Sequence, residues 1–154
     1  MYQKLDTYRK VIMLVDSGST HNFIHHCIAQ ETHCSIHAVN NFQIMIVDGG
    51  SMKCGWCCEN VCLQIGDYHL KYHMFVIDMG GCEIVLGVDW LRSLGPILMD
   101  FNELNMKFDQ DDRWYKFQDI TIGSPEIISS HRMENLLKKG YSAVISQIHA
   151  IQAT

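Results

Sequence analysis

The sequence predicts a mainly β domain with one or two short helices, and three observations support this fold class. Between residues 8 and 118, short apolar segments are separated by glycine-containing and acidic turns, as in strands joined by tight connections. Only 19–32 and 87–95 carry apolar residues at helical spacing in this range. The chain has 154 residues, 47% of them hydrophobic and only 2 of them proline, which suits one domain with a substantial core.

The expected strands follow one another closely along the chain. They lie at 10–15, 42–47, 51–57, 61–65 and 68–77, with weaker patterns at 98–101, 107–108 and 114–117. A short helix is expected within 19–32, and a second within 87–95, where Gly95 and Pro96 end it. The segments IMLVDSGS and EIVLGVDWL share a weak pattern, because each takes an apolar strand into a glycine-bearing turn and then a helix.

The sequence changes character after Gly123. A proline break is followed by apolar residues at roughly helical spacing, namely Met133, Leu136, Leu137, Val144 and Ile148. We therefore expect residues 1–120 to form the domain and 121–154 to form a linker or helical appendage.

Composition argues against several classes of protein. The net charge is -5 and no basic block is longer than Lys138-Lys139, which argues against nucleic-acid binding. No apolar run reaches the roughly 18 to 20 residues of a membrane span, and the N-terminus lacks the apolar stretch of a signal peptide. Seven cysteines, an odd number, favour reduced thiols and a cytoplasmic location.

The segment VIMLVDSGSTHNFI, residues 11–24, ends a predicted buried strand on the carboxylate of Asp16. An ionised carboxylate beside a core is costly unless it is paired or used, although a turn or capping role is the common alternative. Gly18 can bring backbone N–H groups close to Asp16, and the hydroxyls of Ser17 and Ser19 can form local hydrogen bonds. A carboxylate held in this way can remain ionised and position a water molecule.

Hydrolysis of a peptide bond by carboxylates requires two of them sharing a proton. No second Asp-(Ser/Thr)-Gly occurs in the chain, and Asp89 at the start of the second expected helix is better explained by capping. A two-fold homodimer would bring two copies of Asp16 to its axis, because the same patch meets itself in such an interface. The residues therefore predict that Asp16 of another copy is the partner.

Three segments in order carry a resemblance to a known family: MLVDSGSTHNFI, VDGGSMKC and FVIDMGGCEIVLGVDWLRSLGPILMDF. Over residues 8–118 they resemble the retropepsin-type aspartic proteases of plant Ty3/gypsy long-terminal-repeat retrotransposon polyproteins. The tail MENLLKKGYSAVISQI is similar to the linker that leads to reverse transcriptase in those polyproteins. The resemblance implies a closed retropepsin-like (acid protease) β-barrel in 1–120 that is active as a two-fold homodimer, followed by that linker in 121–154.

The resemblance also implies roles for individual residues. Asp16 would be the catalytic residue of each subunit, Ser17 would join the hydrogen bonds that tie the two active-site loops together, and Gly18 would allow their close approach. Gly87 matches the glycine that opens the helix behind the active-site loop.

The glycine pair in IMIVDGGSMKC matches the flap of the family, a hairpin whose tip covers the bound peptide. The local sequence agrees, because the residues Asp48, Gly49, Gly50 and Ser51 lie between two alternating apolar runs and strongly predict a hairpin. These four residues are expected to bind substrate, although an ordinary hairpin is the alternative.

The cysteine cluster CGWCCENVC raises a zinc-binding alternative. Together with two downstream histidines it approximates a zinc-finger spacing, through Cys54, Cys57, Cys58, Cys62, His69 and His73. His69 and His73 are expected on a strand, however, where four residues span about 13 Å and could not share one ion. Buried free thiols are the better interpretation, and no metal or cofactor is expected.

The leading functional interpretation is an aspartic endopeptidase that acts on extended polypeptide. Its natural substrate, by the resemblance, is the element's own Gag-Pol-type polyprotein, cut in the cytoplasm or within virus-like particles. Ile77, Val85 and Leu86 are expected to line subsites. Neither nucleic acid nor a membrane is expected as a direct partner.

A Ser17 or Ser19 hydrolase is disfavoured because G-x-S-x-G is absent. The alternative is a catalytically degenerate or domesticated copy that retains the fold as a dimerisation or peptide-binding module.

Overall fold

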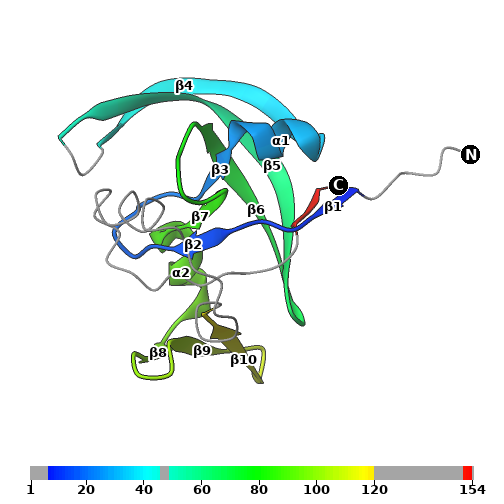
Figure 1. Ribbon diagram of the computed structural model, residues 1–154, viewed down its shortest axis with the longest axis vertical. Coiled ribbons are helices and arrows are strands. Elements are labelled where there is room, and N and C mark those ends of the chain that lie inside the picture. Colours follow the sequence, from blue (N-terminus) through cyan, green and yellow to red (C-terminus); the bar gives the residue numbers. More distant parts are fainter. Residues whose placement is uncertain (1–6, 46–48, 120–150, 154) are drawn as a thin grey trace, which may run out of the picture.

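The computed structural model describes residues 7–45, 49–119 and 151–153 of the chain. It confirms the mainly β fold class with two short α-helices, an architecture consistent with a retropepsin-like fold (Figure 1). In chain order the elements are β1 (Thr7–Arg9), β2 (Met13–Val15), β3 (Phe23–His25), α1 (His26–Glu31), β4 (Ser35–Met45), β5 (Ser51–Ile65), β6 (Tyr68–Ile77), β7 (Ile84–Leu86), α2 (Val88–Leu91), the 3-10 helix η1 (Arg92–Leu94), β8 (Ile97–Asp100), β9 (Asn105–Gln110), β10 (Arg113–Gln118) and β11 (Ile151–Ala153).

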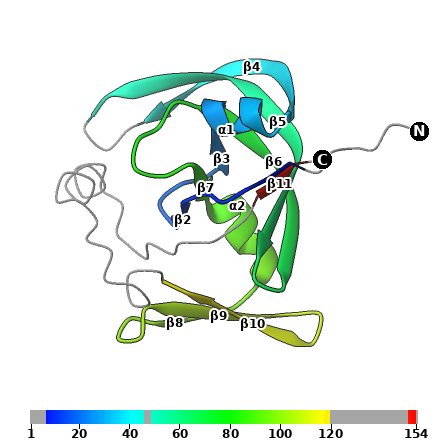
Figure 2. The same cartoon turned by 45° about the vertical axis from the view of Figure 1, so that its right-hand side comes forward.

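The strands form two sheets. The larger has eight strands in the order β1-β11-β5-β6-β3-β7-β2, and β4 pairs with β5 beside this path. The smaller sheet has the order β10-β9-β8 and lies at the end of the molecule opposite β4 (Figures 1 and 2). Both β4 and β11 pair with β5, β4 along 51–59 and β11 along 61–63.

The long central strands follow from their sequence patterns. The expected strand 68–77 coincides with β6, whose first residues alternate between buried and exposed. The strands expected separately at 51–57 and 61–65 form the single strand β5. An irregularity in the pairing of β5 with β6 falls between Cys58 and Val61, where Asn60 has a φ of 56°. The break expected from the sequence is therefore a bulge inside one strand.

The helix expected within 19–32 is only partly correct. Phe23 lies on β3, and α1 begins three residues later at His26. The reason is that β3 is inserted between two neighbours, parallel to β6 and antiparallel to β7, and these ladder hydrogen bonds override local helical spacing. The second helix was predicted correctly, because α2 and η1 occupy Val88–Leu94 and Gly95 follows with a φ of 71°.

Two clusters of buried side chains form the core. Met13 and Val15 on one face of β2 belong to the larger cluster, whereas Leu14 on the other face belongs to the smaller one with Phe23 and Val85. A strand buried on both faces needs a continuous apolar run, which explains the segment VIMLV.

Trp90 of α2 attaches the smaller sheet to the rest of the core. It is fully buried, stacks on Phe117 with ring centroids 6.1 Å apart, and meets Phe108 edge-on at 6.2 Å. Among the described residues no helix is long and apolar enough to cross a membrane. The helical pattern expected between Met133 and Ile148 lies outside the described residues.

Candidate active site

Asp16 directly follows β2, the last strand in the order of the larger sheet. β2 pairs in parallel with β7, with Val15 opposite Leu86. The backbone N–H of Asp16 donates to the carbonyl oxygen of Leu86 at 2.9 Å, which continues this pairing by one residue. The two segments that share the strand-turn-helix pattern in the sequence are therefore direct neighbours, and their turns meet.

The turn after β2 holds the Asp16 carboxylate through the backbone. Oδ1 of Asp16 accepts a hydrogen bond from the N–H of Gly18 at 2.8 Å, and the N–H of Ser19 donates to the Asp16 carbonyl at 3.2 Å. A Cβ atom on Gly18 would lie 3.2 Å from Oδ1, so glycine gives this contact its room. Asp16 is half-buried while Ser17 and Gly18 are exposed. Within the described residues Oδ2 accepts no hydrogen bond, so it is available to an external group.

The start of α2 supports this turn from behind. Val88 N–H donates to the carbonyl of Ser19 at 2.7 Å, and Asp89 N–H donates to that of Thr20 at 3.2 Å. Gly87 is the N-terminal flanking residue of α2, and it lies so close to the turn that a Cβ atom there would be 2.6 Å from the Ser19 oxygen. This agrees with the position expected for Gly87. Asp89 lies in the first turn of α2, and its Oδ2 is 3.9 Å from His73 Nε2.

Asn22 is a residue whose role the sequence did not reveal. It is buried, and its Oδ1 accepts a hydrogen bond from the N–H of Gly87 at 2.9 Å, while its carbonyl accepts one from Phe75 N–H at 3.0 Å. Asn22 thus joins the turn to β6 and to the start of α2. Its side-chain Nδ2 is buried without a hydrogen-bond partner among the described residues. No local signal could identify these contacts, because Gly87 is 65 positions away.

His21, which follows the turn in the sequence, contacts three phenylalanine rings. The centroid of its ring lies 5.1 Å from Phe75, 5.4 Å from Phe42 and 6.3 Å from Phe23. Phe42 belongs to β4, so this aromatic contact connects the active-site turn to the hairpin that the sequence identified as a flap. Phe23 and Ile24, which follow His21 on β3, are buried.

The hairpin of β4 and β5 has the form expected around the glycine pair. Met45 pairs with Ser51 at the end nearest the turn, and Gly49 has a φ of 86°, a conformation that suits glycine. Gly49, Gly50 and Ser51 are exposed, and Asp48 lies outside the described residues. This end of the hairpin and the turn that follows β2 lie on the same side of the molecule (Figures 1 and 2). Substrate binding by these residues stays a prediction.

The three expected subsite residues differ in accessibility. Val85 is 2% exposed and Leu86 is fully buried, because β7 lies between β3 and β2 with neighbours on both sides. Leu86 packs in the larger core cluster, so its expected place in a subsite is wrong for this conformation. Ile77 at the end of β6 is half-buried and remains accessible.

The cysteine cluster on β5 is explained by burial. Cys54, Cys57 and Cys58 are free thiols and are buried, as expected for small apolar side chains. Burial raises the pKa of Cys54 and Cys57 above its ordinary value. Within the described residues these thiols do not form a group with His69 and His73 that could hold one ion, so the zinc-finger-like spacing has no structural counterpart.

Comparison with known protein families gives one match. The model of the PEG10/RTL1 protease domain matches residues 12–114, a range that includes the Asp16 turn, the β4–β5 hairpin and α2. A comparison with curated proteins finds no match for the chain.

Proposed function

The chain belongs to the PEG10/RTL1 protease-domain family, a retropepsin-like family, and from this membership we propose that it is an aspartic endopeptidase. The observation that carries the proposal is the Asp16 carboxylate. It stands at the exposed end of a buried strand, its Oδ1 is held by a backbone N–H, and its Oδ2 has no partner among the described residues. A carboxylate in this arrangement is oriented by the backbone and open to a substrate.

A homodimer supplies the second carboxylate. One Asp16 cannot both accept a proton from the attacking water and donate a proton to the peptide carbonyl oxygen. Two copies facing each other share one proton, because two adjacent like charges cannot both be ionised. The ionised Asp16 accepts a proton from water as the water oxygen bonds to the peptide carbon, while the protonated one donates to the carbonyl oxygen. The C–N bond then breaks as the proton taken from water passes to the leaving amine, and one hydroxyl of the intermediate returns its proton to the other carboxylate.

Ser17 and Gly18 serve this arrangement without taking part in proton transfer. Both are exposed at the tip of the turn, where a second copy would approach. The Ser17 hydroxyl would donate across the two-fold axis, and the missing side chain of Gly18 would let the two turns come close. Gly49, Gly50 and Ser51, with Asp48, would close over the peptide, since a hairpin end rich in glycine can move as a lid.

The proposed substrate is extended polypeptide, and the Gag-Pol-type polyprotein of a Ty3/gypsy element is the natural candidate. Cleavage of such a polyprotein would occur in the cytoplasm or within particles assembled from it. The motifs of the sequence carry this assignment, including its attribution to plant-type elements.

The second candidate is a module that retains the fold without turnover. The name of the matching family favours this candidate, because PEG10/RTL1 proteases derive from domesticated Ty3/gypsy genes. Such a module would dimerise or bind a peptide through the same face.

The decisive experiment is peptidase activity as a function of protein concentration at mildly acidic pH, on a mixed peptide library. Asp16→Asn is the matched variant, because it keeps the size of the side chain and an oxygen that can accept the Gly18 N–H. We expect cleavage that rises faster than linearly with concentration in the dilute range and disappears in Asp16→Asn. A dilute sample that is mostly monomeric would be silent, so the oligomeric state is measured by sedimentation on the same samples.

Wild-type protein that is dimeric by sedimentation, yet cleaves no faster than Asp16→Asn, would refute the enzyme and leave the binding module. Activity that is strictly proportional to concentration in samples shown to be monomeric would refute the shared active site.

A further inference from the structure

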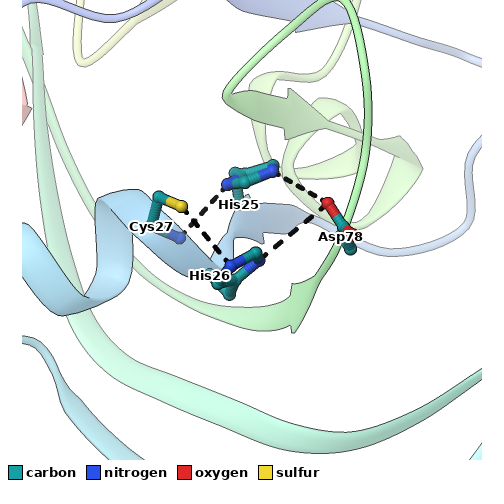
Figure 3. A network of polar contacts seen from close by, with 4 residues as sticks. All are labelled: His25, His26, Cys27 and Asp78. Carbon is teal, nitrogen blue, oxygen red and sulfur yellow. Dashed lines mark hydrogen bonds and ion pairs between the residues drawn. The ribbon is translucent and has the colours of Figure 1, made fainter.

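Four side chains that can bind a metal ion meet at the junction of β3, α1 and the loop after β6 (Figure 3). His25, His26 and Cys27 are consecutive in the sequence, and Asp78 directly follows β6. Parallel pairing of β3 with β6 places His25 opposite Ile77, which brings Asp78 to the histidine pair. None of the four belongs to the Asp16 turn or to the hairpin.

The donor atoms have the spacing of a metal site. One side-chain nitrogen of each histidine and the Cys27 sulfur all lie within 4.8 Å of one another. His26 Nε2 is 3.4 Å from Cys27 Sγ, whereas a tetrahedral zinc ion would place such a nitrogen and sulfur about 3.6 Å apart. The Asp78 Oδ1 atom is 3.0 Å from His25 Nε2 and 3.9 Å from His26 Nδ1, so it lies at the other end of the two rings from Cys27 and outside this group of three donors.

An ion from solvent can reach this group. The side chains of His25, His26 and Asp78 are 18%, 45% and 80% exposed, and Cys27 is exposed as well. The two imidazole rings are stacked with centroids 4.5 Å apart, so their nitrogens lie close together at the surface. Exposure distinguishes Cys27 from the buried thiols of β5.

We propose that His25, His26 and Cys27 form a binding site for one borderline-soft divalent cation of the zinc class, and that Asp78 orients the His25 ring from its other nitrogen. Imidazole nitrogen and thiolate sulfur are the donors that zinc prefers, while magnesium and calcium take oxygen ligands. Three protein donors lie within reach of one another, which is the number that zinc sites with an open fourth position use.

The existing hydrogen bonds of His25 decide which of its nitrogens can bind the cation. Its Nδ1 accepts a hydrogen bond from the Cys27 N–H at 3.1 Å, so the neutral ring carries its proton on Nε2, facing Asp78. A cation held by Cys27 and His26 Nε2 would bind Nδ1 of His25, and the proton stays on Nε2, where the Asp78 carboxylate accepts it and orients the ring. The Cys27 N–H loses its acceptor, and Cys27 binds as thiolate after releasing its own proton.

The site would fasten the loop between β6 and β7. The far end of this loop is already anchored, because the Glu83 carbonyl accepts from His25 N–H at 2.9 Å and its Oε2 accepts from Ile12 N–H at 2.7 Å. A cation bound by the histidine pair and Cys27 would fix the His25 ring, and through the 3.0 Å contact of His25 Nε2 with Asp78 it would anchor the near end to α1. The bound cation would therefore raise the melting temperature of the whole domain.

The test is a titration of the full, reduced, tag-free chain with Co²⁺, followed by displacement with Zn²⁺. Cobalt replaces zinc in such sites, and a thiolate ligand produces an intense near-ultraviolet charge-transfer band. We expect one equivalent of Co²⁺ with this band, its loss on addition of Zn²⁺, and a higher melting temperature with Zn²⁺.

Three variants separate this site from other ligands. Cys27→Ser should abolish the charge-transfer band and the thermal shift. His25→Asn keeps an oxygen that can accept the Cys27 N–H but removes the metal-binding nitrogen, and should weaken binding about tenfold or more. Cys62→Ser, which changes a partly exposed cysteine on β5, should leave both signals unchanged.

Two results would overturn the proposal. One is a wild-type chain that is folded by circular dichroism and takes up no cobalt with a thiolate band. The other is a Cys27→Ser variant that keeps the band and the affinity of the wild type.

Discussion

Gly87 is the residue at which α2 and the active-site turn come closest. Its backbone is extended, so the constraint is one of space: a side chain would meet the carbonyl oxygens of Ser19 and His21. We expect Gly87→Ala to lower the free energy of unfolding by about 1–3 kcal/mol, since the crowded atoms are backbone and cannot turn aside. Urea denaturation measures this change.

Gly66→Ala is the control for that substitution. No atom lies within 4 Å of the Cβ position at Gly66, and only its φ of 57° opposes a side chain, at a cost on the order of 1 kcal/mol. Equal losses of unfolding free energy in the two variants, together with unchanged peptidase activity in Gly87→Ala, would contradict the inference that Gly87 leaves room for the carbonyl oxygens of the turn.

Cys34 is expected to ionise at a lower pH than the buried cysteines of β5. A hydrogen bond from the Cys58 thiol, opposed by burial and aided by the Thr32 hydroxyl 3.3 Å away, lowers the pKa of Cys34 from 9.0 to about 6. Alkylation of Cys34 by iodoacetamide, followed by mass spectrometry of its peptide, should therefore rise with pH through a midpoint near 6. Cys57, whose pKa is raised by burial, should react slowly over the same range.

The same shift predicts a pH dependence of stability. Because the folded-state pKa of Cys34 is depressed, its contribution to the free energy of unfolding is complete above pH 9. This contribution is lost as the pH falls through about 6. In Cys58→Ala the donor is gone, so the alkylation midpoint of Cys34 should move upward. A midpoint unchanged by this substitution would show that Cys58 is not the cause.

At the scale of the element, α2 depends on Trp90 for its attachment to the smaller sheet. Trp90 is fully buried between the rings of Phe108 and Phe117, so Trp90→Ala would leave a large cavity. We expect a loss of about 3–5 kcal/mol in the free energy of unfolding. Trp114 on β10 is 65% exposed, and Trp114→Ala should change the free energy of unfolding by less than about 0.5 kcal/mol. Similar losses of unfolding free energy in both variants would contradict the role of Trp90 in the core.

Elements with a clear burial pattern could be predicted from the sequence. β6 alternates between buried and exposed residues at its start, and its bounds were predicted correctly. The first part of β4 was missed because its side chains from Ser35 to Ala38 are all exposed, so burial leaves no periodic signal there. β3 was taken for part of a helix because its strand character depends on partners more than 50 residues away.

The candidate site also has one part that could be predicted from the sequence and one part that could not. The Asp16 turn is encoded locally, since its hydrogen bonds link residues two or three apart, and it was recognised from the sequence. The supports from Asn22 and from the ring of His21 depend on Gly87, Phe42 and Phe75, which reach the turn only through the folded sheet. Local sequence carries no information about such contacts.

At the scale of the whole molecule, β11 completes the larger sheet by pairing with both β1 and β5. Deleting residues 151–154 should lower the melting temperature and speed hydrogen exchange in the 61–63 segment of β5, since its backbone groups lose their partners. The 51–58 segment is still covered by β4 and serves as an internal control. Equal protection of 61–63 before and after the deletion would contradict this pairing.

The register of β1 and β11 has a mechanical consequence. Thr7 pairs with Ala153 and Arg9 pairs with Ile151, so the chain enters β1 and leaves β11 at the same end of the pair. Inter-strand hydrogen bonds of an antiparallel pair are perpendicular to the strands. A tensile load between the two chain ends would therefore pull along these bonds and open them one after another, as in a zipper. The sheet would yield first at this seam, at a lower force than a pair loaded in shear.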